Sequence, residues 1–109
     1  MEFVVILRAT DSSNLPPQAV IGLAKQTFQQ LASKQDKRIK AQYGFAGERA
    51  GILVVDVSSG DELQDLISNL PFAGITKAEV HPVSSVESNL KSIEAAEKRI
   101  ASMMPAGAP

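Results

Sequence analysis

Two apolar stretches constrain the fold more than any other feature: "FVVIL" at residues 3–7 and "GILVVDV" at residues 51–57. A strand with one face in water alternates apolar and polar residues, because successive side chains point to opposite faces. Neither stretch alternates, and Asp56 is the only charged residue in the second. We therefore expect two strands that are covered on both faces.

The rest of the chain divides into further strands and helices. Strand patterns occupy four segments, residues 3–10, 38–45, 51–57 and 75–83. Helical spacing of apolar residues occupies three, residues 17–36, 59–71 and 84–103. Two capping boxes, Ser59 with Glu62 and Ser84 with Glu87, predict where the second and third helices begin. The glycine-containing "AGERAG" at 46–51 predicts a hairpin connection.

This order predicts a ferredoxin-like βαββαβ fold of the α+β class, with an added C-terminal helix. Right-handed crossovers place the first and third strands in the centre and both helices on one face of the sheet. Two helices cover only that face, so we expect the other to be an apolar interface. The simplest cover is a second copy of the chain, its sheet packed face to face about a twofold axis, which gives a homodimer or a larger homo-oligomer.

We expect a ferredoxin-like domain at 1–83, a helical extension at 84–104 and a flexible tail at 105–109. The core unit is complete at Val83, so the last helix is not needed to close it. Its apolar seam runs from Val86 to Met104, is interrupted by Glu97, and is narrow, as contact seams are. We expect this helix to reach a neighbouring subunit; packing on its own subunit is the alternative.

Composition excludes several classes of function. The 109 residues carry 11 basic and 12 acidic side chains, without the basic surface that nucleic-acid binding needs. There is no cysteine and only one histidine, so we expect no thiolate chemistry and no metal site. Met1 is followed directly by Glu2 and a strand pattern, and no apolar run has the length of a membrane span. We expect a cytoplasmic protein that contacts no membrane.

Three segments carry a family resemblance. They are "GERAGILVVDV" at 47–57, "GDELQDLISNLPF" at 60–72 and "EVHPV" at 79–83. Together they resemble muconolactone isomerase and its relatives, members of the dimeric α+β barrel superfamily, over about residues 1–83. The resemblance implies the barrel, a pocket for a small ligand between the sheet and a partner subunit, and an isomerase that works by proton transfer. It implies no cofactor.

The chain also departs from that family at three positions. Val4 and Ile6 stand where the isomerases carry a histidine and an arginine, and Ala41 stands near another family histidine. Three polar groups that the resemblance implies for the pocket are therefore apolar here, whereas Gly47 and Glu48 match.

Lactone isomerisation moves a proton between two carbons, so it needs a base and a cation for the substrate carboxylate. Side chains expected on the face away from the helices are Arg8, Lys40, Gln42, Lys77, Glu79 and His81. From these we predict His81 and Glu79 as catalytic residues, because imidazole and carboxylate groups exchange protons. For substrate binding we predict Arg8, the pocket residues Val4 and Ile6, and the hairpin residues Glu48 and Arg49.

Each candidate also has a structural interpretation. His81 and Glu79 are typical of solvated residues on an edge strand, and Arg8 suits an ion pair between subunits as well as carboxylate binding. Glu48 and Arg49 suit a solvated hairpin tip. Tyr43 shares an alternating pattern with Ile39 and Phe45 and is expected in the core. The glycines at 44, 47 and 51 are interpreted as part of the hairpin connection.

Three functions stay open from the sequence. The first is an isomerase-like protein that acts on a small carboxylated or lactone substrate. The second is a cofactor-free oxygenase or cyclase of the same superfamily. The third is a non-catalytic ligand-binding or assembly protein, which the apolar residues Val4 and Ile6 favour.

Overall fold

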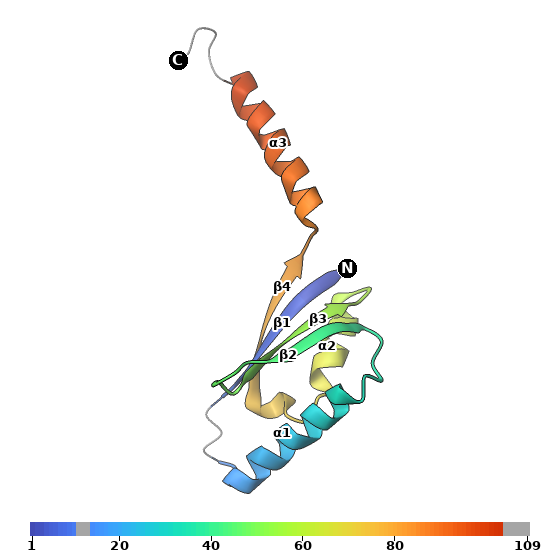
Figure 1. Ribbon diagram of the computed structural model, residues 1–109, viewed down its shortest axis with the longest axis vertical. Helices are drawn as coiled ribbons and strands as arrows, with labels where there is room; N and C mark the ends of the chain where they lie inside the picture. Colours follow the sequence, from blue (N-terminus) through green and yellow to red (C-terminus); the bar gives the residue numbers. More distant parts are fainter. Residues whose placement is uncertain (11–13, 104–109) are drawn as a thin grey trace.

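The computed structural model describes residues 1–10 and 14–103. Its elements follow the order β1 (Glu2–Ala9), α1 (Pro17–Ala32), β2 (Ile39–Gly44), β3 (Ala50–Asp56), α2 (Gly60–Ser68), a short 3-10 helix η1 (Ala73–Ile75), β4 (Thr76–Val83) and α3 (Val86–Met103) (Figure 1). The predicted Met104 contact, the tail at 105–109 and part of the turn at 11–13 lie outside the described residues.

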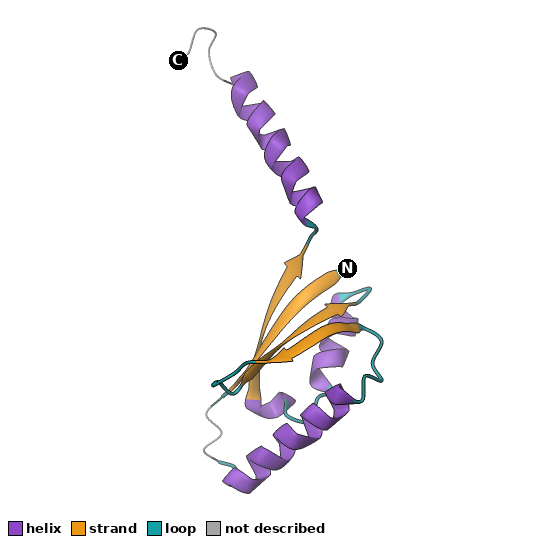
Figure 2. Cartoon of the chain, viewed as in Figure 1, coloured by secondary structure: helices purple, strands orange, loops and turns teal. Residues whose placement is uncertain are grey.

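The four strands form one antiparallel sheet in the order β2-β3-β1-β4. This is the ferredoxin-like order, and it confirms that β1 and β3 are the central strands. Val5 lies opposite Leu53 of β3 and Val80 of β4, and it is fully buried. β4 is an edge strand, where Pro82 leaves no ladder hydrogen bond unmade on its outer side. Figure 2 shows α1 and α2 on one side of the sheet.

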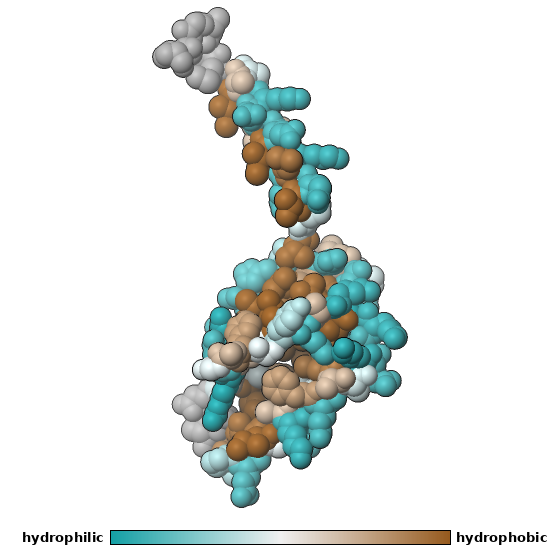
Figure 3. Space-filling view, in the orientation of Figure 1, coloured by the Kyte–Doolittle hydropathy of each residue, from teal (hydrophilic) through white to brown (hydrophobic). Residues whose placement is uncertain are grey.

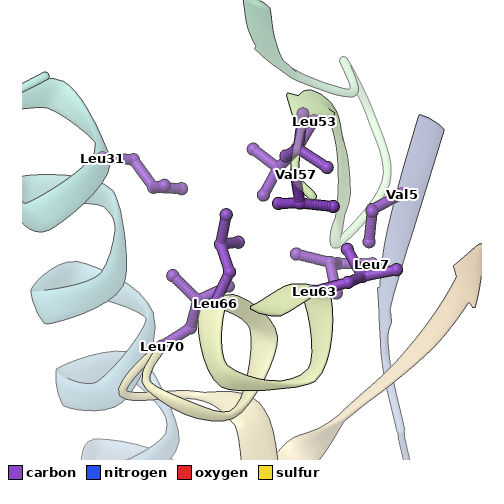
Figure 4. Close-up of a cluster of buried hydrophobic side chains, with 9 residues drawn as sticks. Val5, Leu7, Leu31, Leu53, Val57, Leu63, Leu66 and Leu70 are labelled. Atoms are coloured by element: carbon purple, nitrogen blue, oxygen red, sulfur yellow. The ribbon is translucent and has the colours of Figure 1, made fainter. Parts of the chain in front are cut away.

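The core lies between that side of the sheet and the two helices. Alternate residues of the central strands point into it, Val5 and Leu7 from β1 and Leu53 and Val55 from β3. The helices contribute a second layer, Leu31, Leu63 and Leu66, with Leu70 from the turn after α2, and Figure 4 shows these side chains facing the strand side chains. These leucines recur at helical spacing in the sequence, which is why α1 and α2 pack by one face.

Each of the two helices α2 and α3 begins at a serine cap, but only the Ser59 cap is the predicted one, and neither helix has the simple capping box. The Ser59 hydroxyl accepts the Glu62 N–H at 3.1 Å, whereas the Glu62 carboxylate turns back one residue further and accepts the Ser58 N–H at 2.9 Å. At α3 the cap lies one residue later than predicted, because Ser85, and not Ser84, accepts the Ser88 N–H at 3.0 Å. Each helix still gains an acceptor for its unpaired N–H groups.

A bulge in β2 overturns the predicted position of Tyr43. Ile39 pairs with the core residue Val55, but the register then shifts, and Ala41 pairs with Val54 and Tyr43 with Ile52. One extra residue moves the following side chains to the opposite face. Tyr43 is consequently 70% exposed on the face without helices and is not a core residue.

The same shift corrects Gln42, which was predicted on the face away from the helices. It points to the helix side, where its amide donates to the carbonyl of Leu31 at 2.8 Å. That bond ties the edge strand β2 to the C-terminal end of α1.

The last helix, α3, projects away from the sheet and from the other two helices. The structure measures 70 × 29 × 25 Å, and Figure 1 shows α3 extending from the end of β4, away from α1 and α2. None of its residues is buried. Brown, apolar side chains follow one side of α3 in Figure 3. No helix in the described part of the chain has the length and hydropathy of a membrane span.

The buried hydroxyl of Thr27 gives a stability test. It donates to the Leu23 carbonyl at 2.8 Å and accepts the N–H of Phe72 at 3.0 Å, which links α1 to the chain after α2. Thr27→Val keeps the volume but leaves the Phe72 N–H without its acceptor, so we expect a loss of about 1–3 kcal/mol in the free energy of unfolding. Urea denaturation measures this. Ser33→Ala, at an exposed hydroxyl, is the control and should change the value by less than about 0.5 kcal/mol.

Candidate functional site

An apolar cavity of about 520 Å³ lies between α1 and the β2–β3 half of the sheet. Its lining includes Leu7 and Leu53 from the central strands, Val20, Ala24 and Phe28 from α1, and Phe72 after α2. The Phe28 and Phe72 rings meet edge to face at 6.4 Å between centroids and hold part of this wall. The volume lies in the range of small-molecule sites, about 300–1,000 Å³.

Two glycines explain why space is left there. Gly44 of β2 lies opposite Gly51 of β3, and Gly51 lies opposite Leu7 of β1, so the pair belongs to the face that α1 covers. Neither glycine places a side chain under Phe28; a Cβ on Gly44 would stand 3.9 Å from the Phe28 ring. Leucine or valine at position 44, as elsewhere on this face, would occupy the cavity, whereas a Cβ on Gly51 would stand 3.0 Å from the backbone oxygen of Tyr43, so Gly51 permits the close approach of β2 and β3.

Charged groups from the β2–β3 hairpin stand at the mouth of this cavity. Glu48 and Arg49 both line it. Gly47 has φ +76°, a backbone conformation that glycine adopts without strain, and it turns the hairpin just before them. Arg8 reaches the same place from β1: its Nη1 lies 3.4 Å from Glu48 Oε1 and its guanidinium 5.9 Å from the centre of the Phe45 ring.

A second group of candidates occupies the face of the sheet without helices, which we call the open face. Val4 pairs with His81, Ile6 with Glu79, and Arg8 with Lys77, and paired residues point to the same side. The predicted sharing of one face by Arg8, Glu79 and His81 is therefore present. Arg8 and His81 are separated by four residue steps of pairing, about 13 Å along the strands.

Glu79 and His81 contact each other directly. His81 Nε2 lies 3.0 Å from Glu79 Oε2, and both side chains are more than half exposed. The hydrogen bond from His81 is the main cause that lowers the pKa of the Glu79 carboxyl below its ordinary value. Desolvation opposes it, and the nearby charges of His81, Arg8 and Lys77 add smaller effects in the lowering direction. An exposed carboxylate with this partner is ionised at neutral pH.

The predicted site residues thus fall into two groups. Glu48 and Arg49, with Arg8 beside them, lie at the cavity, whereas Val4, Ile6, Glu79 and His81 lie on the open face. The cavity itself lies on the helix side of the sheet, not on the open face from which a pocket was predicted. The residues that the sequence interpretation missed are Gly44 and Gly51. Their signal is that two glycines interrupt strand patterns at equal distances from the hairpin turn.

A second hollow, of about 580 Å³, is polar and lies at the other end of β2. Its arginine is already engaged, because Arg38 Nη2 contacts Asp36 Oδ2 at 2.8 Å and Arg38 Nη1 contacts Asp65 Oδ2 at 3.5 Å. The Arg38 hydrogen bonds lower the pKa of the Asp36 carboxyl. These ion pairs join the loop before β2 to α2. We therefore assign the charged residues of this hollow a structural role. Within residues 1–10 and 14–103 no three histidine or carboxylate side chains are grouped as metal ligands.

Comparison with known proteins supplies the family. The family model of muconolactone delta-isomerase matches residues 1–89. The crystal structure of muconolactone isomerase superposes with a TM-score of 0.64 at 24% identity, covering 79% of this chain and 95% of that one. The 5-chloro-2-hydroxyhydroquinone dehydrochlorinase of Burkholderia phenoliruptrix AC1100, in complex with 2,5-dihydroxybenzoquinone, has a TM-score of 0.56 at 17% identity, covering 81% and 98%. No curated protein sequence matches. The two structures establish the shared fold.

The Glu79–His81 contact predicts a pKa change that NMR can measure. His81→Ala removes the hydrogen bond, so the pKa of the Glu79 carboxyl should rise toward its ordinary value in a ¹³C carboxyl titration. Because the folded-state pKa is the lowered one, the pair stabilises the fold above the unfolded pKa of about 4.3 and stops doing so as pH falls through the folded value. Asp36 is the control, and its pKa should stay low in the variant. An unchanged Glu79 titration would show that the pair does not form in solution.

Proposed function

The chain belongs to the muconolactone delta-isomerase family, and from this premise we propose that it binds a small carboxylated or lactone ligand in the cavity between α1 and the sheet, and isomerises it by proton transfer. The observation that carries the proposal is an apolar cavity of about 520 Å³ whose lining includes the charged residues Glu48 and Arg49, with Arg8 in contact with Glu48. Apolar walls with few convergent polar groups are typical of small-molecule sites.

The charged residues near the cavity have two different roles in the proposed reaction, substrate binding and proton transfer. Arg49 and Arg8 are placed to bind the ligand carboxylate, because the guanidinium fork matches a carboxylate in charge and geometry. Glu48 is the base: its carboxylate removes a proton from one ring carbon, the double bond shifts, and the same carboxyl returns the proton to the other carbon. The proton count balances, and no electron donor or acceptor is needed. In the free protein the Glu48 carboxylate contacts the Arg8 guanidinium at 3.4 Å.

Glu79 and His81 form the alternative acid–base pair. Their contact of 3.0 Å lies on the open face, where Val4 and Ile6 supply apolar surface. A site there is incomplete in one chain and needs the sheet of a second copy to cover it. Comparing the activity of a His81 variant with that of a Glu48 variant shows which of the two positions holds the acid–base group.

A non-catalytic ligand-binding protein is the second candidate function. The apolar lining around Leu7, Phe28 and Phe72 favours it, because only the mouth of the cavity is charged. The same ligand would then bind without turnover. A measurement that reports binding and proton exchange separately therefore decides between the two functions.

We propose further that the open face is the surface through which the chain self-associates. Val4 and Ile6 of β1 and Ile52 and Val54 of β3 lie side by side on it, and none of them is fully buried. Apolar side chains on two adjacent central strands form a patch of the kind that marks interfaces. Light scattering that finds a monodisperse monomer would contradict this assignment.

Filling the cavity is the direct test of the ligand site. Gly44→Val adds a side chain that points at Phe28 into the cavity, where a Cβ has room at 3.9 Å. Because valine also suits a strand, the fold should be kept while the affinity for muconolactone, measured by calorimetry, falls at least about tenfold. Gly60→Val at the start of α2, away from the cavity, is a steric control for added volume. Unchanged affinity with a folded Gly44→Val variant would place the site elsewhere.

The mouth residues are tested in the same titration. Arg49→Met should lose about 1.5–3 kcal/mol of binding free energy, the range for a charge-assisted hydrogen bond. Lys37→Met, in the loop before β2, removes a positive charge at an exposed position outside the cavity lining and should bind as the unchanged protein does. Glu48→Gln should bind but no longer exchange ring protons for deuterium in D₂O. If His81→Ala and not Glu48→Gln abolishes exchange, the acid–base pair is the one on the open face. If the unchanged protein binds without exchange, the protein is a binding protein.

A further inference from the structure

The structure leaves the apolar side of α3 without a partner. Five large apolar side chains along it are exposed: Val86, Leu90, Ile93, Ile100 and Met103. The seam follows spacings of four, three, seven and three residues, so it runs along one side of the helix, as Figure 3 shows. An isolated helix of this length is marginal in water, so a partner surface must stabilise it.

A second exposed apolar surface lies on α1, along the flank that borders the cavity. Ile21 is 64% exposed and Phe28 is 50% exposed, and both contribute to the lining of the cavity. On this side the cavity opens between α1 and the edge strand β2. We call these two residues, with Lys25 between them, the α1 flank.

The two surfaces match in spacing and in charge. Ile21, Lys25 and Phe28 on α1 have the same separations as Ile93, Glu97 and Ile100 on α3. Each set is apolar, charged, apolar at i, i+4 and i+7, which places its three side chains on one side of a helix. The charges are opposite, and neither Lys25 nor Glu97 forms an ion pair within the described ranges. If α3 packed instead against α3 of another copy, Glu97 would lie among apolar side chains or next to the other copy's Glu97.

One chain cannot bring these surfaces together. α3 projects from one end of the 70 Å molecule, whereas α1 lies at the other (Figure 1). Across two copies the contact is accessible, because α3 follows β4, the α1 flank lies beside β2, and these are the two edge strands. Both edges present unpaired backbone groups that another strand can satisfy.

We infer that α3 of one copy lies along the α1 flank of a second copy, with Glu97 paired to Lys25, and forms the outer wall of that copy's cavity. Ile93 and Ile100 then cover the exposed side chains of Ile21 and Phe28. The family model's match stops at residue 89, so the seam from Leu90 to Met103 lies beyond it and belongs to this chain's own C-terminal segment. The inference concerns which surfaces meet and holds whichever ligand enters the cavity.

A charge exchange tests the pairing. Glu97→Lys and Lys25→Glu should each raise the dissociation constant of self-association at least about tenfold in sedimentation velocity, because like charges across a seam repel. The double variant Glu97→Lys with Lys25→Glu should restore association. Glu94→Lys, which makes the same charge change off the seam, is the matched control and should associate as the unchanged protein does. If the double variant associates no better than the single ones, Glu97 and Lys25 are not partners.

Cross-linking locates the contact without relying on affinity. The chain has no cysteine, so single variants Lys25→Cys and Glu97→Cys can be mixed and oxidised with a mild thiol oxidant without background. The expected product is the mixed dimer, and Glu94→Cys in place of Glu97→Cys should yield little of it. A predominant Glu97→Cys homodimer would assign the seam to a second α3, and an intramolecular disulfide in the double-cysteine chain would assign it to its own subunit; either result overturns the inference.

Discussion

Two helices can cover one face of a four-stranded sheet and no more, and this chain has central strands that are apolar on both faces. On the covered face Val5 and Val55 reach complete burial beneath α1 and α2. On the open face their strand neighbours Val4 and Val54 are only partly buried, because no element of the same chain lies over them. Water contact with such side chains costs free energy in proportion to their exposed apolar area. The exposed apolar surface of the β1–β3 pair therefore provides a hydrophobic driving force for self-association.

The ligand cavity comes from local exceptions to the same packing. Its position on the covered face is set by Gly44 and Gly51, which remove two side chains from a layer that is otherwise closely packed. The bulge at Ile39–Ala41 turns Gln42 inward to hold α1 at Leu31, and α1 spans the space without closing it. The hairpin then supplies the charged residues Glu48 and Arg49 at the open end. Apolar walls and charged mouth thus come from one β-hairpin and the helix above it.

Much of the fold could be predicted from the sequence, because it depends on local residue patterns that can be read without knowing the tertiary contacts. Non-alternating strands, helical leucine spacing and serine caps each report one local preference, and crossover handedness leaves few ways to combine them. Tyr43 and Gln42 could not be assigned to a face, because a bulge is a one-residue event that reverses every later position in the strand. The cavity could not be predicted either, since it consists of absent side chains whose alignment depends on the exact pairing of β2 with β3. For the same reason Arg8, Glu79 and His81 could be placed on one face, yet their distance from the cavity could not be inferred.

Self-association and ligand binding are coupled if α3 of a second copy forms the cavity wall. The side of the cavity bordered by Ile21 and Phe28 is exposed in one chain, so a ligand there keeps part of its surface in water. A helix laid over that side buries the ligand and the two side chains together. If the wall makes the binding free energy of the ligand more favourable by some amount, the bound ligand makes the association free energy of the two copies more favourable by the same amount. This holds because the coupling between two binding events is reciprocal. The exposed seam of α3 and the open cavity are then two halves of one site, and the affinity of this protein for its ligand depends on its own concentration.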